Sequence, residues 1–63
     1  MKEKNRLSLL GKTAVTESEL NPRGIIQIDN EIFGAQTDGE FIEQGKGVKV
    51  IREKGSRIFV VRA

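Results

Sequence analysis

Three acidic residues in a glycine-rich stretch are the first candidates for chemistry in this sequence. Asp38, Glu40 and Glu43 lie close together around Gly39, and paired carboxylates can act as general acid and general base. Such work needs a cleft that buries one carboxyl group and raises its pKa. A chain of 63 residues has little cleft to offer. Solvated loop charges are therefore the favoured interpretation of these residues.

Nucleophilic and metal chemistry lack the residues that they need. The chain has no histidine and no cysteine, so a serine nucleophile has no histidine base and zinc would depend on carboxylates alone. Ser8, Ser18 and Ser56 occur without a Gly-x-Ser-x-Gly motif. Gly45-Lys46-Gly47 lacks the spacing of a P-loop, and a strand is expected after it. The sequence predicts a domain that is not an enzyme and has no cofactor, metal or small-molecule substrate.

Short β-strands are the elements that must position any functional residue. β-Branched residues, apolar alternation and frequent glycines predict five strands, at residues 11–16, 25–29, 31–36, 48–53 and 57–62. A strongly bent sheet that closes on itself suits so few strands, because closure removes exposed edges. The predicted fold class is all-β, a small five-stranded OB-fold-like β-barrel over residues 10–63, after a flexible lead-in at residues 1–9. Near that boundary, Leu7, Leu9 and Leu10 could form a short strand or a flap over the core.

An aliphatic core has to stabilise the domain, because no disulfide can help a chain of this size. Isoleucine and valine supply it in the predicted strands and loops. The expected core residues are Ile25, Ile26, Ile28, Ile32, Ile42, Val48, Val50, Ile51, Ile58, Val60 and Val61.

Two connections between strands are expected to be ordered loops. Residues 17–24 contain one apolar anchor, Leu20. Residues 37–47 are long for a hairpin connection, and Phe41 and Ile42 indicate that they pack against the barrel.

Special backbone positions are predicted at four places. Asp29-Asn30 is typical of a hairpin turn with Asn30 in the left-handed region. Gly34 inside a strand suggests a bulge or a barrel corner, and Gly24 permits a close approach or a positive φ. Lys54-Gly55 is expected to turn the last hairpin.

The charge pattern argues against a nucleic-acid partner. The net charge is only +2, and the basic residues are spread along the chain with acidic residues among them, which is typical of a solubilising surface. Four basic residues could share one sheet face: Lys49, Arg52, Arg57 and Arg62. Single-strand binding also needs exposed aromatic rings, and core packing explains all three of them: Phe33, Phe41 and Phe59. An oligonucleotide-binding OB module stays open as the alternative function.

Two motifs together carry a family resemblance. Gly11-Lys12-Thr13-Ala14-Val15-Thr16 with Leu20-Asn21-Pro22-Arg23-Gly24 resembles the opening of the C-terminal domain of NfeD-type membrane proteins. Gly39-Glu40-Phe41-Ile42-Glu43-Gln44-Gly45, followed by Val48-Lys49-Val50, resembles the second signature of that domain. Asn30 stands where that family often has glycine, and Thr13-Ala14 replaces another usual glycine. A biotinyl or lipoyl carrier barrel is a rival resemblance, but only Lys54 lies at a hairpin tip, outside the usual carrier motif.

The NfeD resemblance implies a function that the residues alone do not show. It implies an OB-like barrel that docks to a stomatin- or flotillin-like membrane scaffold, with transmembrane helices ahead of it in the full-length protein. The chain itself has no apolar run of the ~20 residues that span a bilayer. A soluble domain is therefore expected, and with the resemblance we expect it on the cytoplasmic side. The serine protease region of long family members has no counterpart here. The expected partner-binding residues are Glu40, Phe41, Lys49, Arg52 and Arg57.

Overall fold

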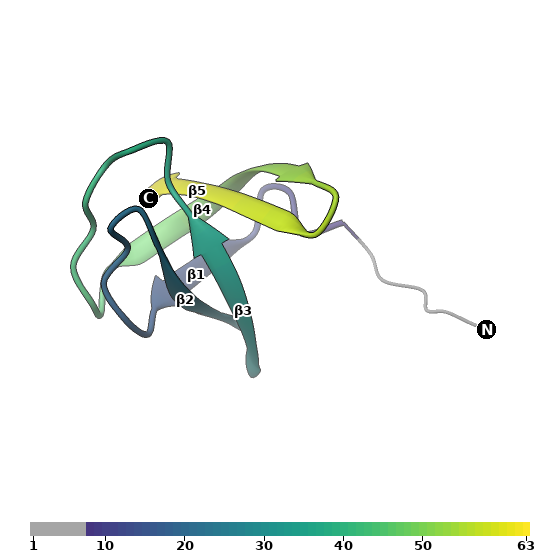
Figure 1. The fold of residues 1–63 in the computed structure, drawn as a ribbon. Coiled ribbons are helices and arrows are strands. Elements are labelled where there is room, and N and C mark those ends of the chain that lie inside the picture. Colours follow the sequence, from purple (N-terminus) through teal and green to yellow (C-terminus); the bar gives the residue numbers. More distant parts are fainter. Residues whose placement is uncertain (1–7) are drawn as a thin grey trace.

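The computed structural model describes residues 8–63, and this part of the chain folds into five strands without a helix. The strands are β1 (Thr13–Thr16), β2 (Arg23–Ile28), β3 (Glu31–Gln36), β4 (Gly47–Lys54) and β5 (Arg57–Arg62). They form a closed barrel in the order β1-β2-β3-β5-β4 (Figure 1). The predicted all-β, five-stranded barrel is confirmed, and it is consistent with a small OB-like fold.

Antiparallel pairing joins every neighbouring pair of strands except one. β2 pairs with β3 along its whole length, and β1 pairs with β2 on one side and β4 on the other. The barrel closes where β3 and β5 run parallel, with Gln36 opposite Phe59. A bulge at Ile51 interrupts the β4–β5 pairing between Val50 and Arg52.

The core fills the single interior of this barrel. Ile26 and Ile28 point inward and are buried, as expected, whereas Ile25 between Gly24 and Ile26 lies outside. Small and apolar side chains from every strand and from three other segments complete the cluster. Its buried members are Leu9, Ala14, Leu20, Ile26, Ile28, Ala35, Ile42, Val48, Val50, Ile58 and Val60.

Four of the residues expected in the core are exposed instead. Ile25, Ile32, Ile51 and Val61 keep 38%, 57%, 45% and 37% of their surface accessible. The reason is geometric: a small barrel has one inner face, so every second residue of a strand faces outward whatever its type. Phe41 is also wrongly assigned to the core, since 44% of it is exposed, whereas Phe59 is buried.

The special backbone positions differ in detail from expectation. In the β2–β3 turn, Asp29 rather than Asn30 occupies the left-handed region, with φ of 57°. Gly34 forms no bulge, because the β2–β3 pairing passes through it without a shift. The last hairpin turns at Gly55 and Ser56, one residue later than predicted.

The segment before β1 is tied to the last hairpin. The Ser8 hydroxyl donates to Oε1 of Glu53 at 2.9 Å, and the Leu9 N–H donates to Oε2 at 3.3 Å. Leu9 is buried in the core and acts as the flap that the sequence suggests, while Leu10 is exposed. The rest of the expected lead-in, residues 1–7 with Leu7 at its end, lies outside the described residues.

Gly24 lets the loop before β2 lie directly on the barrel. A methyl group at this position would lie 2.8 Å from Cδ2 of the buried Leu20 and would collide with the Glu19 carbonyl oxygen. Backbone atoms cannot give way cheaply. The close approach predicted for Gly24 is therefore present, and it depends on the absence of a side chain at this position.

We expect Gly24→Ala to lower the free energy of unfolding by about 1–3 kcal/mol, because the added methyl group overpacks this contact. Gly34→Ala is the matched control, since a methyl group there meets nothing within 4 Å. That variant should be neutral or gain about 0.5–1 kcal/mol from the lost chain entropy of glycine. Urea denaturation measures both. Equal stabilities for the two variants would contradict the close approach.

Candidate docking surfaces

The loop from Thr37 to Lys46, here called the Phe41 loop, is anchored in the barrel core. Its centre forms an isolated bridge with the loop before β2. The Leu20 N–H donates to the Ile42 carbonyl at 2.8 Å, and the Ile42 N–H donates back at 3.1 Å. Both side chains are completely buried. The loop is therefore fixed at its middle as firmly as a strand would be.

A buried threonine fixes the second half of the Phe41 loop. The Thr16 hydroxyl donates to the Glu43 carbonyl at 2.6 Å and accepts the Lys46 N–H at 2.9 Å. The Thr16 carbonyl also accepts the Gly45 N–H at 2.8 Å, at a residue whose φ is +81°. One buried side chain thus satisfies two backbone groups of the loop that would otherwise lack a partner.

The first half of the loop has a similar fixed point. The buried Thr37 hydroxyl donates to the Glu40 carbonyl at 2.5 Å and accepts the Gly39 N–H at 3.1 Å. The Thr37 N–H donates to the Pro22 carbonyl at 2.9 Å. Both ends of the loop are therefore held by hydrogen bonds to buried groups.

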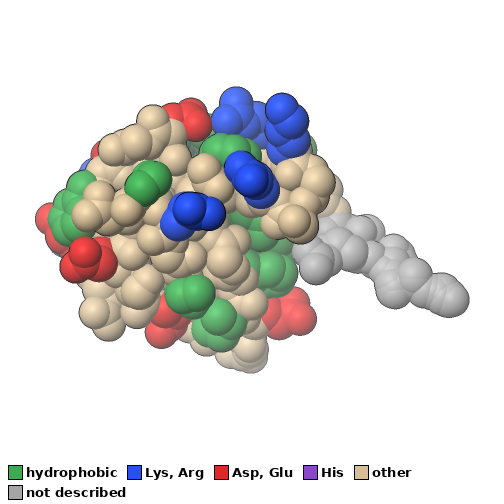
Figure 2. All heavy atoms as spheres, in the orientation of Figure 1, with side chains coloured by type: hydrophobic (Ala, Val, Ile, Leu, Met, Phe, Trp, Pro, Cys, Tyr) green, Lys and Arg blue, Asp and Glu red, His purple; other side chains and the backbone are tan. Residues whose placement is uncertain are grey.

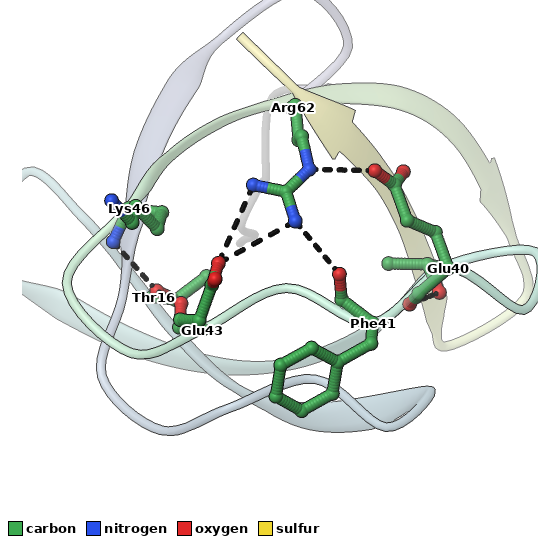
Figure 3. A network of polar contacts seen from close by, with 7 residues as sticks. Thr16, Glu40, Phe41, Glu43, Lys46 and Arg62 are labelled. Carbon is green, nitrogen blue, oxygen red and sulfur yellow. Dashed lines mark hydrogen bonds and ion pairs between the residues drawn. The ribbon is translucent and has the colours of Figure 1, made fainter.

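Arg62 covers the outside of the loop with a fork of contacts (Figure 3). Its Nε donates to Oε2 of Glu40 at 2.7 Å, and Nη2 donates to the Phe41 carbonyl at 2.9 Å. Nη2 also lies 3.4 Å from Oε1 of Glu43. The Phe41 ring points away from the guanidinium group, and 44% of the residue is exposed (Figure 3). The loop thus presents one aromatic ring to solvent on an ordered backbone.

The same network sets the charge state of its members. A hydrogen bond from its own backbone N–H lowers the pKa of Glu43, and the positive charge of Arg62 lowers it further. The hydrogen bond with Glu40 raises the pKa of Arg62. A general acid needs the opposite, a carboxyl group with a raised pKa. Within residues 8–63, no group of acidic side chains is arranged to hold a metal ion.

Basic residues gather on a different surface, the outer face of the β4–β5 hairpin (Figure 2). The register places three cross-strand pairs on this face: Lys49 opposite Val61, Arg52 opposite Phe59, and Lys54 opposite Arg57. Glu53 lies between two of them in sequence but opposite the buried Ile58, on the other face. The charges that look mixed along the sequence are therefore sorted in space, and we call this surface the basic hairpin face.

Arg62 does not belong to the basic hairpin face, although the sequence suggested that it shares one with Lys49, Arg52 and Arg57. It lies opposite the buried Val48, at the end of the barrel. Arg57 and Arg62 are an odd number of positions apart on an unbroken strand, so they point to opposite sides. The bulge at Ile51 has the reverse effect and brings Arg52 to the same side as Lys49.

The five residues expected to bind a partner thus fall into two groups. Glu40 and Phe41 lie in the loop at the end of the barrel, and Lys49, Arg52 and Arg57 lie on the basic hairpin face. An ion pair from Arg52 Nη2 to Oδ1 of Asp38, at 3.2 Å, joins the basic hairpin face to the start of the Phe41 loop.

The basic hairpin face offers no aromatic platform for a nucleic acid. The guanidinium carbon of Arg52 lies 4.2 Å from the centre of the Phe59 ring. Phe59 is buried beneath it. Base stacking needs an open ring face, so this surface does not favour the oligonucleotide alternative.

A third surface was missed from the sequence. The outer face of β1, β2 and β3 carries Val15, Gln27 and Ile32 in one cross-strand row, with Ile25 opposite Gly34 in the next. No member of these rows is charged, and Val15, Ile25 and Ile32 are exposed. The signal was available in Ile25-Ile26, because neighbouring residues of a strand cannot both face the core.

This chain is similar to known proteins both in sequence and in fold. Residues 6–62 match the model of the NfeD family, described as an NfeD-like C-terminal, partner-binding domain. The membrane protein NfeD1b of Bacillus subtilis (strain 168) is 44% identical over 55 residues, which are 87% of this chain and 13% of that protein. This chain therefore spans only a small part of that relative's length.

A solved structure shares the fold along most of both chains. It is the C-terminal domain of the stomatin operon partner protein 1510-C from Pyrococcus horikoshii, with a TM-score of 0.82 and 32% sequence identity. The match covers 87% of this chain and 88% of that one. In the part of the present chain that the structure describes, no helix is long and apolar enough to cross a membrane.

Thr16→Val tests the anchoring of the Phe41 loop. The change keeps the size of the side chain but removes the hydroxyl, so the Glu43 carbonyl and the Lys46 N–H lose their partner. We expect a loss of about 1–3 kcal/mol in unfolding free energy. Thr13→Val, on an exposed position of the same strand, should stay within about 0.5 kcal/mol of the parent. Similar losses for both variants would show that the hydroxyl is not the anchor.

The lowered pKa of Glu43 predicts a pH dependence of stability. Its folded-state pKa lies below the ordinary value of 4.5, so its contribution is present above pH 4.5 and is lost as the pH falls through the folded-state pKa. Glu43→Gln should therefore lower the melting temperature at neutral pH and make little difference in strong acid. Thermal unfolding followed across this range measures the gap. A gap that does not change with pH would contradict the assignment.

Proposed function

This chain belongs to the NfeD family as one of its C-terminal, partner-binding domains, and from that premise we propose that it docks to a stomatin-like membrane protein. The stomatin-like partner is suggested by the solved relative, which is described as a stomatin operon partner protein. A flotillin-like membrane scaffold is the alternative partner in this proposal. The proposed role is to hold a partner and does not include catalysis.

The presentation of Phe41 is the observation that carries this proposal. Aromatic residues dominate the energetics of many protein interfaces, where they fill pockets in the partner surface. A flexible loop would lose conformational entropy when its aromatic residue docks, and an ordered loop avoids that loss. The Phe41 loop is already fixed by the Leu20–Ile42 bridge and by Thr16. Its exposed ring is therefore ready to bind without reorganisation.

The surroundings of Phe41 indicate the chemistry of the partner surface. Glu40 and Glu43 flank the ring in sequence, and Arg62 contacts both carboxylates while leaving each about half exposed. A complementary surface would offer an apolar pocket for the ring, with basic or amide groups at its rim. We propose Glu40 and Phe41 as the centre of this docking surface.

The relatives suggest the setting of the domain. NfeD1b is a membrane protein, and this chain corresponds to a small fraction of its length. We propose that membrane-spanning segments precede this domain in the full-length protein and that the barrel lies on the cytoplasmic side. In long family members any protease activity would then lie in a separate domain.

Phe41→Ala is the direct test of the docking surface. We expect it to weaken binding to a purified stomatin-like protein from the same organism by about tenfold or more, as removal of a central aromatic anchor does. The melting temperature should barely change, because the ring lies outside the core. Isothermal titration calorimetry with the parent chain and the variant measures the difference.

Ile32→Ala is the matched control, because it truncates an apolar residue on the outer face of β3 that is even more exposed than Phe41. Its affinity should equal that of the parent. Undiminished binding by Phe41→Ala, or a larger loss in Ile32→Ala, would place the docking surface elsewhere. No binding by the parent chain at any salt concentration would rule out the stomatin-like partner.

A further inference from the structure

Most of the basic side chains on the basic hairpin face have no acidic partner among the described residues. Within residues 8–63, Lys49, Lys54 and Arg57 take part in no ion pair. Arg52 pairs with Asp38, and both side chains are more than half exposed. Charges of one sign on one exposed face create a local potential that attracts anions.

One cross-strand pair on this face works against the stability of the hairpin. Lys54 lies directly opposite Arg57, beside the turn at Gly55. Like charges that face each other across an antiparallel pair are destabilising. An anion bound between them would remove the repulsion. The same two residues, with Arg52, Gly55 and Phe59, line an open hollow of about 420 Å³.

The hairpin also lies where the chain enters the barrel. Ser8 and Leu9 are hydrogen-bonded to Glu53, next to the hairpin tip. Figure 1 shows the hairpin tip and this entering segment at one end of the barrel, and the Phe41 loop at the other. A membrane anchor ahead of the domain would therefore bring the hairpin close to the bilayer, and would leave Phe41 directed away from it.

We propose that the basic hairpin face binds the anionic phospholipid surface of the membrane, with lipid phosphate groups between Arg52, Lys54 and Arg57. This inference rests on the membrane anchor proposed above. It assigns the two ends of the barrel different tasks, because the hairpin orients the domain on the bilayer while Phe41 meets the protein partner. Lipid is favoured over nucleic acid because Arg52 covers the Phe59 ring, so that bases have nothing to stack on.

Vesicle sedimentation with the 63-residue chain tests this inference. Vesicles of phosphatidylcholine alone are compared with vesicles that also contain phosphatidylglycerol, at low and at physiological salt. The chain should bind the anionic vesicles, should leave the neutral ones unbound, and should dissociate as salt is added. Because the assay contains no protein partner, its failure would leave the proposed docking through Phe41 standing, and failed docking would leave a positive vesicle result standing.

Lys54→Glu separates binding from folding. The change replaces a repulsive cross-strand pair by an attractive one, so the melting temperature should stay the same or rise. Lipid binding should nevertheless fall by about thirtyfold, since each basic residue near an anionic surface contributes about fivefold and the reversal counts twice. Lys46→Glu is the matched control: it makes the same charge change in the Phe41 loop, at the far end, and should keep most of the binding.

Four outcomes would overturn the proposal. They are equal binding to neutral vesicles, no binding to anionic vesicles at low salt, an equal loss in Lys46→Glu, and full binding by Lys54→Glu. A mixed-sequence single-stranded oligonucleotide serves as competitor. If it bound the chain more tightly than the vesicles do, and Lys54→Glu abolished that binding, the face would be assigned to nucleic acid instead.

Discussion

The bridge between Leu20 and Ile42 is the contact on which the rest of this small barrel depends. A domain of 63 residues buries only about 60% of its unfolded surface, so the core that its strands build is small. Two loops make up the shortage, each with one completely buried residue, and paired backbone hydrogen bonds join them. Burial of Ile42 leaves its neighbour Phe41 pointing outward, because successive residues of an extended segment alternate in direction. Stability and the exposed aromatic ring therefore have a common origin.

Much of this arrangement could be predicted from local sequence patterns. Alternation and glycine spacing indicated all five strands and the closed barrel, and they correctly assigned Ile26 and Ile28 to the interior. The apolar anchors Leu20 and Ile42 correctly indicated that both long loops are packed. These features depend on the residue type and on its nearest neighbours, which the sequence contains directly.

The features that were missed depend on which strands meet and in what register. The sequence contains Ile25 and Ile32 as ordinary core formers, and only the closed barrel shows that their positions face outward. The bulge at Ile51 moves Arg52 to the face of Lys49, and no local pattern marks it. Thr16 reads as an ordinary strand residue, yet its hydroxyl anchors residues far along the chain. The register of β4 and β5 also determines which charged residues share one face of the hairpin.

We assign partner docking to the end of the barrel that carries Phe41. Amide chemical-shift mapping tests this most directly, with the isotope-labelled chain titrated by a stomatin-like protein. We predict that the largest changes fall on residues 40–43 and on Arg62, and that Val15 and Ile32 are unaffected. Changes concentrated on the outer face of β1, β2 and β3, with residues 40–43 unmoved, would contradict the account.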